Sequence, residues 1–266
     1  MADPVCPVAV SHMEIVSRTQ RSFKVIAHRG ASGYAPENTL ASFEKGLDLG
    51  ADMLELDIHM SKDSELVVIH DATLERTTNG SGYIKNYSLK ELKQFDASKG
   101  FDAYRGERIP SLQEVFDLAK KRAAFAIEIK NCPILYPDIE KNLVHLIEQN
   151  DLVDDALVIT FYHPSLKEIT RLNPDIQTGI LYTAALIEPW KAAESVGATA
   201  LHPHYAYTFP EMIKEAHKRH YLVHPWTINS VADMEQWLEY GVDGITSDFP
   251  DSLKARYLAH QHHQAA

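Results

Sequence analysis

The sequence predicts an α/β fold: a (β/α)8 barrel of the TIM type, with a small insertion after the second strand. Short runs of β-branched and aliphatic residues alternate with amphipathic segments from Lys24 onward, which is typical of repeated βα units around a parallel sheet. Eight such runs can be counted, the number that a closed barrel of this kind contains. The chain has 266 residues, 45% of them hydrophobic, which is enough for one large core in a single domain.

The predicted strands are short and mostly apolar, and several end in a polar or charged residue. They are KVIAH (24–28), MLELDI (53–58), FAIEI (125–129), LVITF (157–161), TGILY (178–182), TALHP (199–203), YLVHP (221–225) and DGITS (243–247). Several helical segments between them begin at Asn, Ser or Pro and end at Gly or Asn, as helix caps do. An open doubly wound sheet is the alternative. No strand, however, is followed by the GxGxxG or GxxxxGK phosphate loop that marks a nucleotide site in such sheets.

Residues 24–257 are predicted to form the barrel domain, and an irregular stretch at about 60–110 is its insertion. SKDSELVVIHD (61–71) predicts a hairpin, and the residues after it are rich in turn formers. Loops after the strands carry the active sites of this fold, so we expect the insertion to cap the barrel mouth and to shape substrate access. We expect residues 1–23 to be a mobile extension and 258–266 a frayed tail.

Composition limits the partners of the chain. A net charge of -11 disfavours a broad basic surface for nucleic acid or anionic membrane, so the expected partner is a small molecule. If that molecule is an anion, a divalent cation with one or two basic side chains would attract it. Two cysteines are too few for a disulfide framework. We find neither a signal peptide nor an apolar run near the ~20 residues of a membrane span, and therefore predict a cytoplasmic protein. Nothing in the sequence predicts its oligomeric state.

Acidic residues at two predicted strand ends are candidate metal ligands. Glu55 and Asp57 lie two positions apart, so both side chains point to the same face of their strand. Glu128 ends the next barrel strand, two positions before Lys130. Three carboxylates from two strands suit Mg²⁺ or Ca²⁺ rather than zinc, because the set lacks thiolate. Alternatively, these acidic residues lie at strand ends that are exposed to solvent and bind no metal. Lys130 either neutralises the acids or holds a phosphate oxygen.

Two histidines end apolar runs in the same manner. His28-Arg29-Gly30 ends the first strand, and His70-Asp71 follows LVVI in the insertion. A lone histidine on an apolar strand is more often a hydrogen-bonded core residue. Two imidazoles beside a metal, however, could act as general base and general acid in a displacement reaction. One would accept a proton from the attacking group, and the other would donate a proton to the leaving group.

Residues near the ends of the later strands are further candidates for the cavity wall. His202 and His204 flank Pro203, and we favour a structural role for both. Trp226 is a candidate for packing against the alcohol portion of a substrate.

The chain resembles the glycerophosphodiester phosphodiesterases over nearly its whole length, from Lys24 to Pro250. The motifs HRG, PEN, ELD, HD and EIK occur in the order and with the spacing of that family, followed by PWTIN and DGITSDFP. The resemblance implies a barrel that hydrolyses glycerophosphodiesters to sn-glycerol 3-phosphate and an alcohol. Two departures from the family pattern affect the pocket wall: Thr160-Phe161-Tyr162 stands after the fourth strand, where Ser-Phe is common, and His224 stands where a residue such as Asn is expected.

Position by position, the resemblance implies Glu55, Asp57 and Glu128 as ligands of one divalent metal ion, Mg²⁺ or Ca²⁺. It implies His28 and His70 as the catalytic acid–base pair, with His28 favoured as the base and His70 as the acid.

The same resemblance implies Arg29 and Lys130 as phosphate-binding residues. Glu37 and Asn38 of the PEN motif would support the site, and Trp226 would border the glycerol. The attacking group would be either water or the substrate's own glycerol hydroxyl.

Three other functions stay open from the sequence. The chain could act on lysophospholipids in the manner of a lysophospholipase D, it could be a cyclising phosphodiesterase, or it could be a barrel that binds a phosphodiester without catalysis. Two proton-transferring histidines argue against binding alone.

Overall fold

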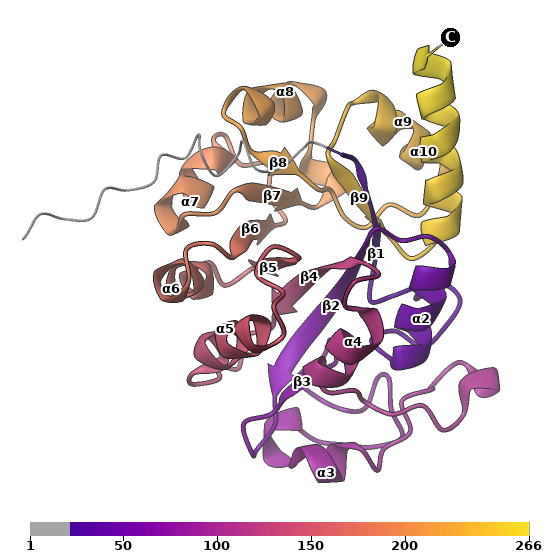
Figure 1. Ribbon diagram of the computed structural model, residues 1–266, viewed down its shortest axis with the longest axis vertical. Helices are drawn as coiled ribbons and strands as arrows, with labels where there is room; N and C mark the ends of the chain where they lie inside the picture. Colours follow the sequence, from indigo (N-terminus) through magenta and orange to yellow (C-terminus); the bar gives the residue numbers. More distant parts are fainter. Residues whose placement is uncertain (1–21, 266) are drawn as a thin grey trace, which may run out of the picture.

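The computed structural model describes residues 22–265. Nine strands form one sheet, in which eight parallel strands curve into a nearly closed barrel in the order β8-β7-β6-β5-β4-β2-β1-β9 (Figure 1). Their bounds are β1 (Lys24–Ala27), β2 (Met53–Met60), β3 (Leu66–Val68), β4 (Ala124–Ile129), β5 (Ala156–Thr160), β6 (Gln177–Tyr182), β7 (Ala200–Pro203), β8 (Leu222–Val223) and β9 (Gly244–Ser247). The predicted (β/α)8 barrel is therefore confirmed.

Hydrogen bonds join the two ends of the strand order. The amide of Asp243 donates to the carbonyl of Val223, and the amide of Thr246 donates to the carbonyl of Pro225. The barrel thus closes between β8 and β9, as its eight-stranded pattern requires.

Helices pack around the outside of the strands, except for α3, which lies in the insertion (Figure 1). They are α2 (Leu40–Asp48), α3 (Leu89–Leu92), α4 (Leu112–Ala119), α5 (Ile139–Gln149), α6 (Pro164–Leu172), α7 (Pro189–Val196), α8 (Pro210–Lys218), α9 (Val231–Glu239) and α10 (Pro250–Ala265). Their starts follow the predicted signals: Ser111 and Glu114 form a capping box at α4, and proline occupies the first turn of α6, α7 and α8.

The C-terminal residues differ from the prediction of a frayed tail. Helix α10 continues to Ala265, because no glycine or proline interrupts residues 251–265 and the helix packs against α9. Residues 1–21 of the predicted N-terminal extension lie outside the described part of the chain.

Side chains along each strand point alternately to the two faces of the sheet, so the apolar ones pack into two separate clusters. On β2, Leu54, Leu56 and Ile58 join the large apolar cluster between the strands and the helices. The intervening Glu55 and Asp57 point to the other face, into the barrel. A smaller cluster fills the barrel interior and consists of Ile26, Met53, Ala126, Leu157, Ile159, Leu181 and Ala200. The strands therefore place acidic groups above an apolar floor.

The insertion is built on the predicted hairpin. β3 pairs antiparallel with the end of β2, with Ile58 opposite Val68 and Met60 opposite Leu66. A separate apolar cluster holds the insertion together, with Val67, Ile69, Leu74, Ile84, Leu92, Ala97 and Ile109 at its centre. The hairpin directs the chain back along β2, so that His70 follows β3 at the edge of the barrel.

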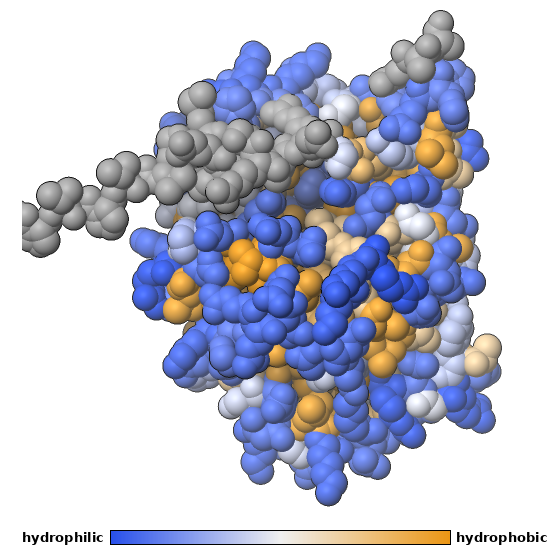
Figure 2. All heavy atoms as spheres, in the orientation of Figure 1, coloured by the Kyte–Doolittle hydropathy of each residue, from blue (hydrophilic) through white to orange (hydrophobic). Residues whose placement is uncertain are grey.

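The surface gives no sign of a membrane span. Among residues 22–265, no helix is both long and apolar enough to cross a bilayer. Hydrophilic side chains cover most of the face shown in Figure 2, with smaller apolar areas between them.

Candidate active site

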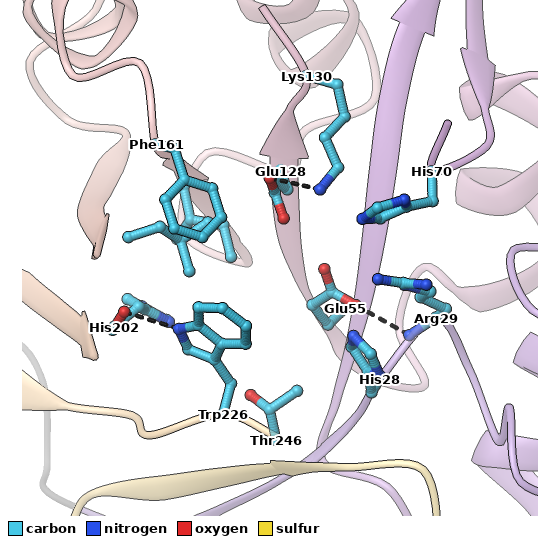
Figure 3. A pocket seen from close by; sticks show the side chains of 12 residues that line it. His28, Arg29, Glu55, His70, Glu128, Lys130, Phe161, His202, Trp226 and Thr246 are labelled. Atoms are coloured by element: carbon cyan, nitrogen blue, oxygen red, sulfur yellow. Dashed lines mark hydrogen bonds and ion pairs between the residues drawn. The ribbon is translucent and has the colours of Figure 1, made fainter. Parts of the chain in front are cut away.

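A cavity of about 130 Å³ opens at the carboxyl ends of the barrel strands. Charged residues from β1, β2, β4 and the insertion line one side, and mainly apolar residues from β5 to β9 line the other (Figure 3). The lining residues are His28, Arg29, Glu55, His70, Glu128, Lys130, Ile159, Phe161, Leu181, His202, Trp226 and Thr246. An adjoining groove of about 410 Å³ shares His70, Glu128, Lys130 and Phe161 with this cavity. Most of the residues predicted from the sequence therefore meet in one place.

The three predicted metal ligands converge. Asp57 and Glu128 are direct neighbours in the β2–β4 register, and Glu55 lies two residues before Asp57 on the same face. One potential ligand atom from each of the three side chains lies within 4.8 Å of the others, and all three residues are buried. This donor set consists of oxygen atoms only, which fits a hard divalent cation.

Burial makes the acidic cluster electrostatically costly without a cation. Desolvation, followed by repulsion from Asp57 and Glu128, raises the pKa of Glu55 well above its usual range. Burial likewise raises the pKa of Glu128 to about 7, although Lys130 opposes the shift. The pKa of Asp57 instead falls well below its usual range, because the positive charges of Lys130 and Arg29 outweigh its desolvation. A divalent ion would stabilise the ionised form of all three carboxylates.

Lys130 and Arg29 both contact the acidic cluster. Lys130 Nζ lies 2.6 Å from Glu128 Oε1 and 3.0 Å from Asp57 Oδ1. Arg29 Nε lies 3.2 Å from Asp57 Oδ2, and the Arg29 backbone amide donates to Glu55 Oε2 at 2.9 Å. Arg29 adopts a left-handed conformation with φ of 54°, which turns the chain directly after β1. Both cations line the cavity and are available to an anionic ligand.

The PEN motif supports this arrangement. Asn38 Nδ2 donates to Asp57 Oδ2 at 2.8 Å, and the Asp57 amide donates to Asn38 Oδ1 at 3.3 Å. Glu37 accepts a hydrogen bond of 2.9 Å from Arg29 Nη1. Asn38 thus orients a predicted metal ligand, and Glu37 orients a predicted phosphate-binding residue.

His28 has a carboxylate partner that the sequence interpretation did not single out. Its Nδ1 lies 2.6 Å from Oδ1 of Asp248, which follows β9. The same carboxylate accepts hydrogen bonds from Ser32 Oγ at 2.9 Å and Asn229 Nδ2 at 2.6 Å. The motif DGITSDFP could have indicated this partner, because it places an acid one residue after β9, the strand that pairs with β1.

His70 has a similar partner in its own motif. Its Nδ1 lies 2.6 Å from Asp71 Oδ1, and Arg76 Nε donates to Asp71 Oδ2 at 2.7 Å. Although partial burial opposes it, hydrogen bonds from Arg76 and His70 lower the pKa of Asp71 to about 2. The His70 carbonyl also accepts a hydrogen bond from His59 Nε2 at 3.0 Å. His28 and His70 are therefore each held by a carboxylate at Nδ1, which leaves Nε2 for a substrate.

Aromatic residues form the opposite wall. The ring centroids of Phe161 and Trp226 are 5.6 Å apart in an edge-to-face contact. The indole N–H of Trp226 donates to the carbonyl of His202 at 2.8 Å, which fixes the plane of the ring. Trp226 thus lies where it was predicted, whereas Phe161 was considered only as part of a departure from the family pattern.

The remaining histidines take different positions. His202 lines the cavity, whereas His204 does not: its Nδ1 accepts a hydrogen bond from the Ala206 amide at 3.3 Å. His224 lies one layer deeper, with its ring 5.0 Å from that of His202. The structural role predicted for His204 agrees with these contacts, but His202 has a place in the cavity wall.

Sequence comparisons identify relatives over nearly the whole barrel. The model of the glycerophosphoryl diester phosphodiesterase family matches residues 28–252. A glycerophosphodiester phosphodiesterase of Caldanaerobacter subterraneus subsp. tengcongensis is 43% identical over 231 residues, which cover 86% of this chain and 95% of that protein. One from Bacillus subtilis is 35% identical over 249 residues, which cover 85% of this chain and 83% of that protein.

Solved structures agree. A phosphodiesterase of Oleispira antarctica, in complex with the product sn-glycerol 3-phosphate, matches with a TM-score of 0.80 and 30% identity over 87% of this chain and 95% of that chain. A glycerophosphodiester phosphodiesterase of Agrobacterium tumefaciens matches with a TM-score of 0.78 and 29% identity over 88% of this chain and 99% of that chain. The chain therefore belongs to the glycerophosphoryl diester phosphodiesterase family.

Proposed function

We propose that the protein hydrolyses glycerophosphodiesters to sn-glycerol 3-phosphate and an alcohol, with one Mg²⁺ or Ca²⁺ ion and with His28 and His70 as the proton-transferring pair. One observation carries this proposal: two carboxylate-held histidines and a buried cluster of three acids share one cavity. A protein that only binds a phosphodiester has no need for two such histidines.

Glu55, Asp57 and Glu128 are the proposed ligands of the divalent ion. When bound, the ion would supply positive charge next to the phosphate, which favours both binding and the negative charge that develops during displacement. The family match and the all-oxygen donor set support a divalent ion, and the raised pKa values of Glu55 and Glu128 are the observation that a cation would explain.

Arg29 and Lys130 are the proposed phosphate-binding residues. Both contact the acidic cluster and both line the cavity, so both would be near a phosphate bound beside the cluster. Charge-assisted hydrogen bonds from these donors would hold the nonbridging oxygens and orient the phosphorus for attack.

His28 is the proposed base and His70 the proposed acid. His28 lines the cavity but not the adjoining groove, whereas His70 lines both, and in the groove an alcohol leaving the phosphate has room. His28 would take the proton of the attacking hydroxyl, from water or from the substrate's glycerol, as the new P–O bond forms. His70 would give its proton to the leaving oxygen as the old P–O bond breaks. With the glycerol hydroxyl as nucleophile, water would then open the resulting cyclic phosphate.

The test measures release of sn-glycerol 3-phosphate from glycerophosphocholine and glycerophosphoethanolamine, with Mg²⁺, Ca²⁺ or EDTA. We expect turnover that requires a divalent ion and that falls by about 10²- to 10⁴-fold in His28→Ala. Glu128→Gln is expected to lose the dependence on the ion together with the activity. Exposed His145, changed to Gln, controls for loss of a surface imidazole. Full turnover in EDTA, or in His28→Ala, would contradict the proposal.

A further inference from the structure

One buried histidine connects the proposed acid to the strand that carries two of the proposed metal ligands. His59 lies on β2, is 2% exposed, and follows Asp57 by two positions on the same face of the strand. Its Nε2 atom lies 3.0 Å from the backbone carbonyl oxygen of His70. Because a carbonyl oxygen can only accept, Nε2 carries the proton and is the donor. This bond fixes the main chain at His70, whereas Asp71 and Arg76 hold its side chain.

The other ring nitrogen of His59 has a partner from a different loop. Its Nδ1 lies 2.9 Å from the hydroxyl oxygen of Tyr136, and the two ring centroids are 5.5 Å apart in an edge-to-face contact. In a neutral imidazole protonated at Nε2, Nδ1 is an acceptor, so the Tyr136 hydroxyl donates to it. Tyr136 is 4% exposed and lies in the loop between β4 and α5. His59 therefore links this loop to the main chain at His70.

The loop between β4 and α5 also carries a proposed phosphate-binding residue. Lys130 begins this loop, and the next residue, Asn131, is buried and accepts a hydrogen bond of 2.7 Å from the Tyr136 amide. Lys130 and His70 both line the cavity and the adjoining groove, and both point into the cavity (Figure 3). The hydrogen bonds of Asn131, Tyr136 and His59 thus connect the segments that carry these two residues.

The position of His70 depends on such contacts with β2. Strand β2 is fixed in the barrel wall between β1 and β4, whereas His70 follows β3, which has only three residues and pairs with β2 alone. Besides the bond from His59, the Ile69 amide donates to the carbonyl of Asp57 at 3.0 Å. A displacement of a reacting group by about 1 Å can lower a rate by about 10²-fold. A contact that fixes the main chain at His70 therefore has a large effect on proton donation.

We propose that His59 and Tyr136 are positioning residues for the proposed acid. They hold the main chain of His70 in a fixed position relative to the acidic cluster, so that its Nε2 faces the leaving oxygen of a phosphate bound there. This inference rests on the proposed function, in which His70 donates a proton to the leaving alcohol. His59 uses both ring nitrogens within the protein, and Tyr136 lines neither the cavity nor the groove. Both therefore act through His70.

The test compares two substrates that share the glycerol phosphate half and differ in the leaving group: glycerophosphocholine and the p-nitrophenyl ester of sn-glycerol 3-phosphate. Choline leaves as a strongly basic alkoxide and needs a proton from the acid, whereas p-nitrophenolate is weakly basic and leaves without one. A displaced acid slows only the first reaction, but a disturbed metal site slows both. His70→Ala is the reference, because the change in its ratio of the two kcat values gives the full effect of proton donation.

His59→Leu should shift this ratio in the same direction as His70→Ala. We expect kcat for glycerophosphocholine to fall by about 10- to 100-fold, with less than about threefold change in kcat for the p-nitrophenyl ester and in KM for either substrate. His59→Gln should recover most of the loss, because its amide offers a donor to the His70 carbonyl and an acceptor to the Tyr136 hydroxyl. Tyr136→Phe, which removes only the hydroxyl, should show part of the loss.

Two further variants test the specificity of the effect. The double variant of His59→Leu and Tyr136→Phe should lose no more activity than His59→Leu alone, because both residues act through one contact with His70. His163→Leu is the matched control. It also removes an imidazole that donates from Nε2 to a backbone carbonyl, that of Leu181 at 2.9 Å, and His163 lines neither the cavity nor the groove. Its ratio of the two kcat values should match the wild type.

Each outcome decides one proposal. Equal losses on both substrates in His59→Leu, or an unchanged ratio there while His70→Ala shifts it, overturn the positioning role and leave the proposed function intact. An unchanged ratio in His70→Ala overturns the role of His70 as the acid, and this inference with it. Absence of turnover by the wild type overturns the proposed function itself. If melting curves show that His59→Leu does not fold, Tyr136→Phe decides, because an unchanged ratio in that variant also overturns the positioning role.

Discussion

The imidazole of His28 and the carboxylate of Asp248 lie 2.6 Å apart, although 220 positions separate them in the sequence. Asp248 also accepts hydrogen bonds from Ser32 and Asn229, so its carboxylate is fixed before a substrate binds. These bonds, together with the pairing to His28, lower the pKa of Asp248 despite its burial. The ionised carboxylate therefore keeps the proton of His28 on Nδ1 and leaves Nε2 free to accept another.

Loss of this carboxylate should impair catalysis more than binding. For Asp248→Asn we expect kcat to fall by about 10²- to 10⁴-fold while KM changes only a few-fold, because the amide orients His28 without stabilising its charged form. Steady-state kinetics with glycerophosphocholine measures both constants. Asp251→Asn is the control, since this nearby carboxylate accepts a hydrogen bond from Tyr34 instead. An equal loss in both variants would contradict a specific role for Asp248.

Divalent ions should stabilise the fold through the acidic cluster. At an ion concentration about 100-fold above Kd, binding to the native state adds about 2.7 kcal/mol to the free energy of unfolding. We expect Mg²⁺ or Ca²⁺ to raise the melting temperature of the wild type, and Glu128→Gln to lose most of this shift. Thermal melts with and without EDTA measure it independently of activity. Equal shifts in both proteins would place the ion elsewhere.

Stability should decrease in mild acid because of buried, neutral histidines. Burial lowers the pKa of His224 from 6.5 to about 4. The unfolded chain therefore binds a proton that the folded protein excludes, so the stabilisation is complete above pH 6.5 and is lost as the pH falls toward 4. This group contributes up to about 1.4 kcal/mol per pH unit. Urea unfolding at pH 7 and pH 5 should show a smaller decrease for His224→Asn, and the same decrease in both proteins would refute this origin.

Local sequence patterns predict the acidic cluster of the site. Glu55, Asp57 and Glu128 follow from the twofold alternation of strands and from the rule that parallel strand ends meet at one edge. The pairing of His28 with Asp248 could not be predicted in this way. It depends on the parallel pairing of β1 with β9, which brings together residues from opposite ends of the chain.

Side-chain contacts in the barrel interior also escape local patterns. The sequence interpretation favoured a structural role for His202, because a histidine on an apolar strand is more often a core residue. Its place in the cavity wall depends on the missing side chain of Gly179 on the neighbouring strand, and on the Trp226 indole that its carbonyl holds. Such packing arises from three strands at once, and no single motif encodes it.

One guanidinium from the insertion links the two halves of the charged wall. Arg76 donates to both oxygens of Glu37, the partner of Arg29. It also donates to both oxygens of Asp71, the partner of His70. Arg76 thus orients the proposed phosphate-binding arginine and the proposed acid without lining the cavity itself.

Arg76→Ala should therefore lower kcat/KM by about tenfold or more, because a small misplacement of reacting groups is costly in rate. Stability should change by only about 1 kcal/mol or less, since the side chain is 44% exposed. Arg76→Lys should recover little activity, because a single ammonium cannot replace the planar fork that spans two carboxylates. The control is Arg122→Ala, which removes a similarly exposed arginine that binds both oxygens of Glu44 on the outside of the barrel. If both alanine variants keep full activity, the insertion does not align the site through Arg76, and the hairpin alone must position His70.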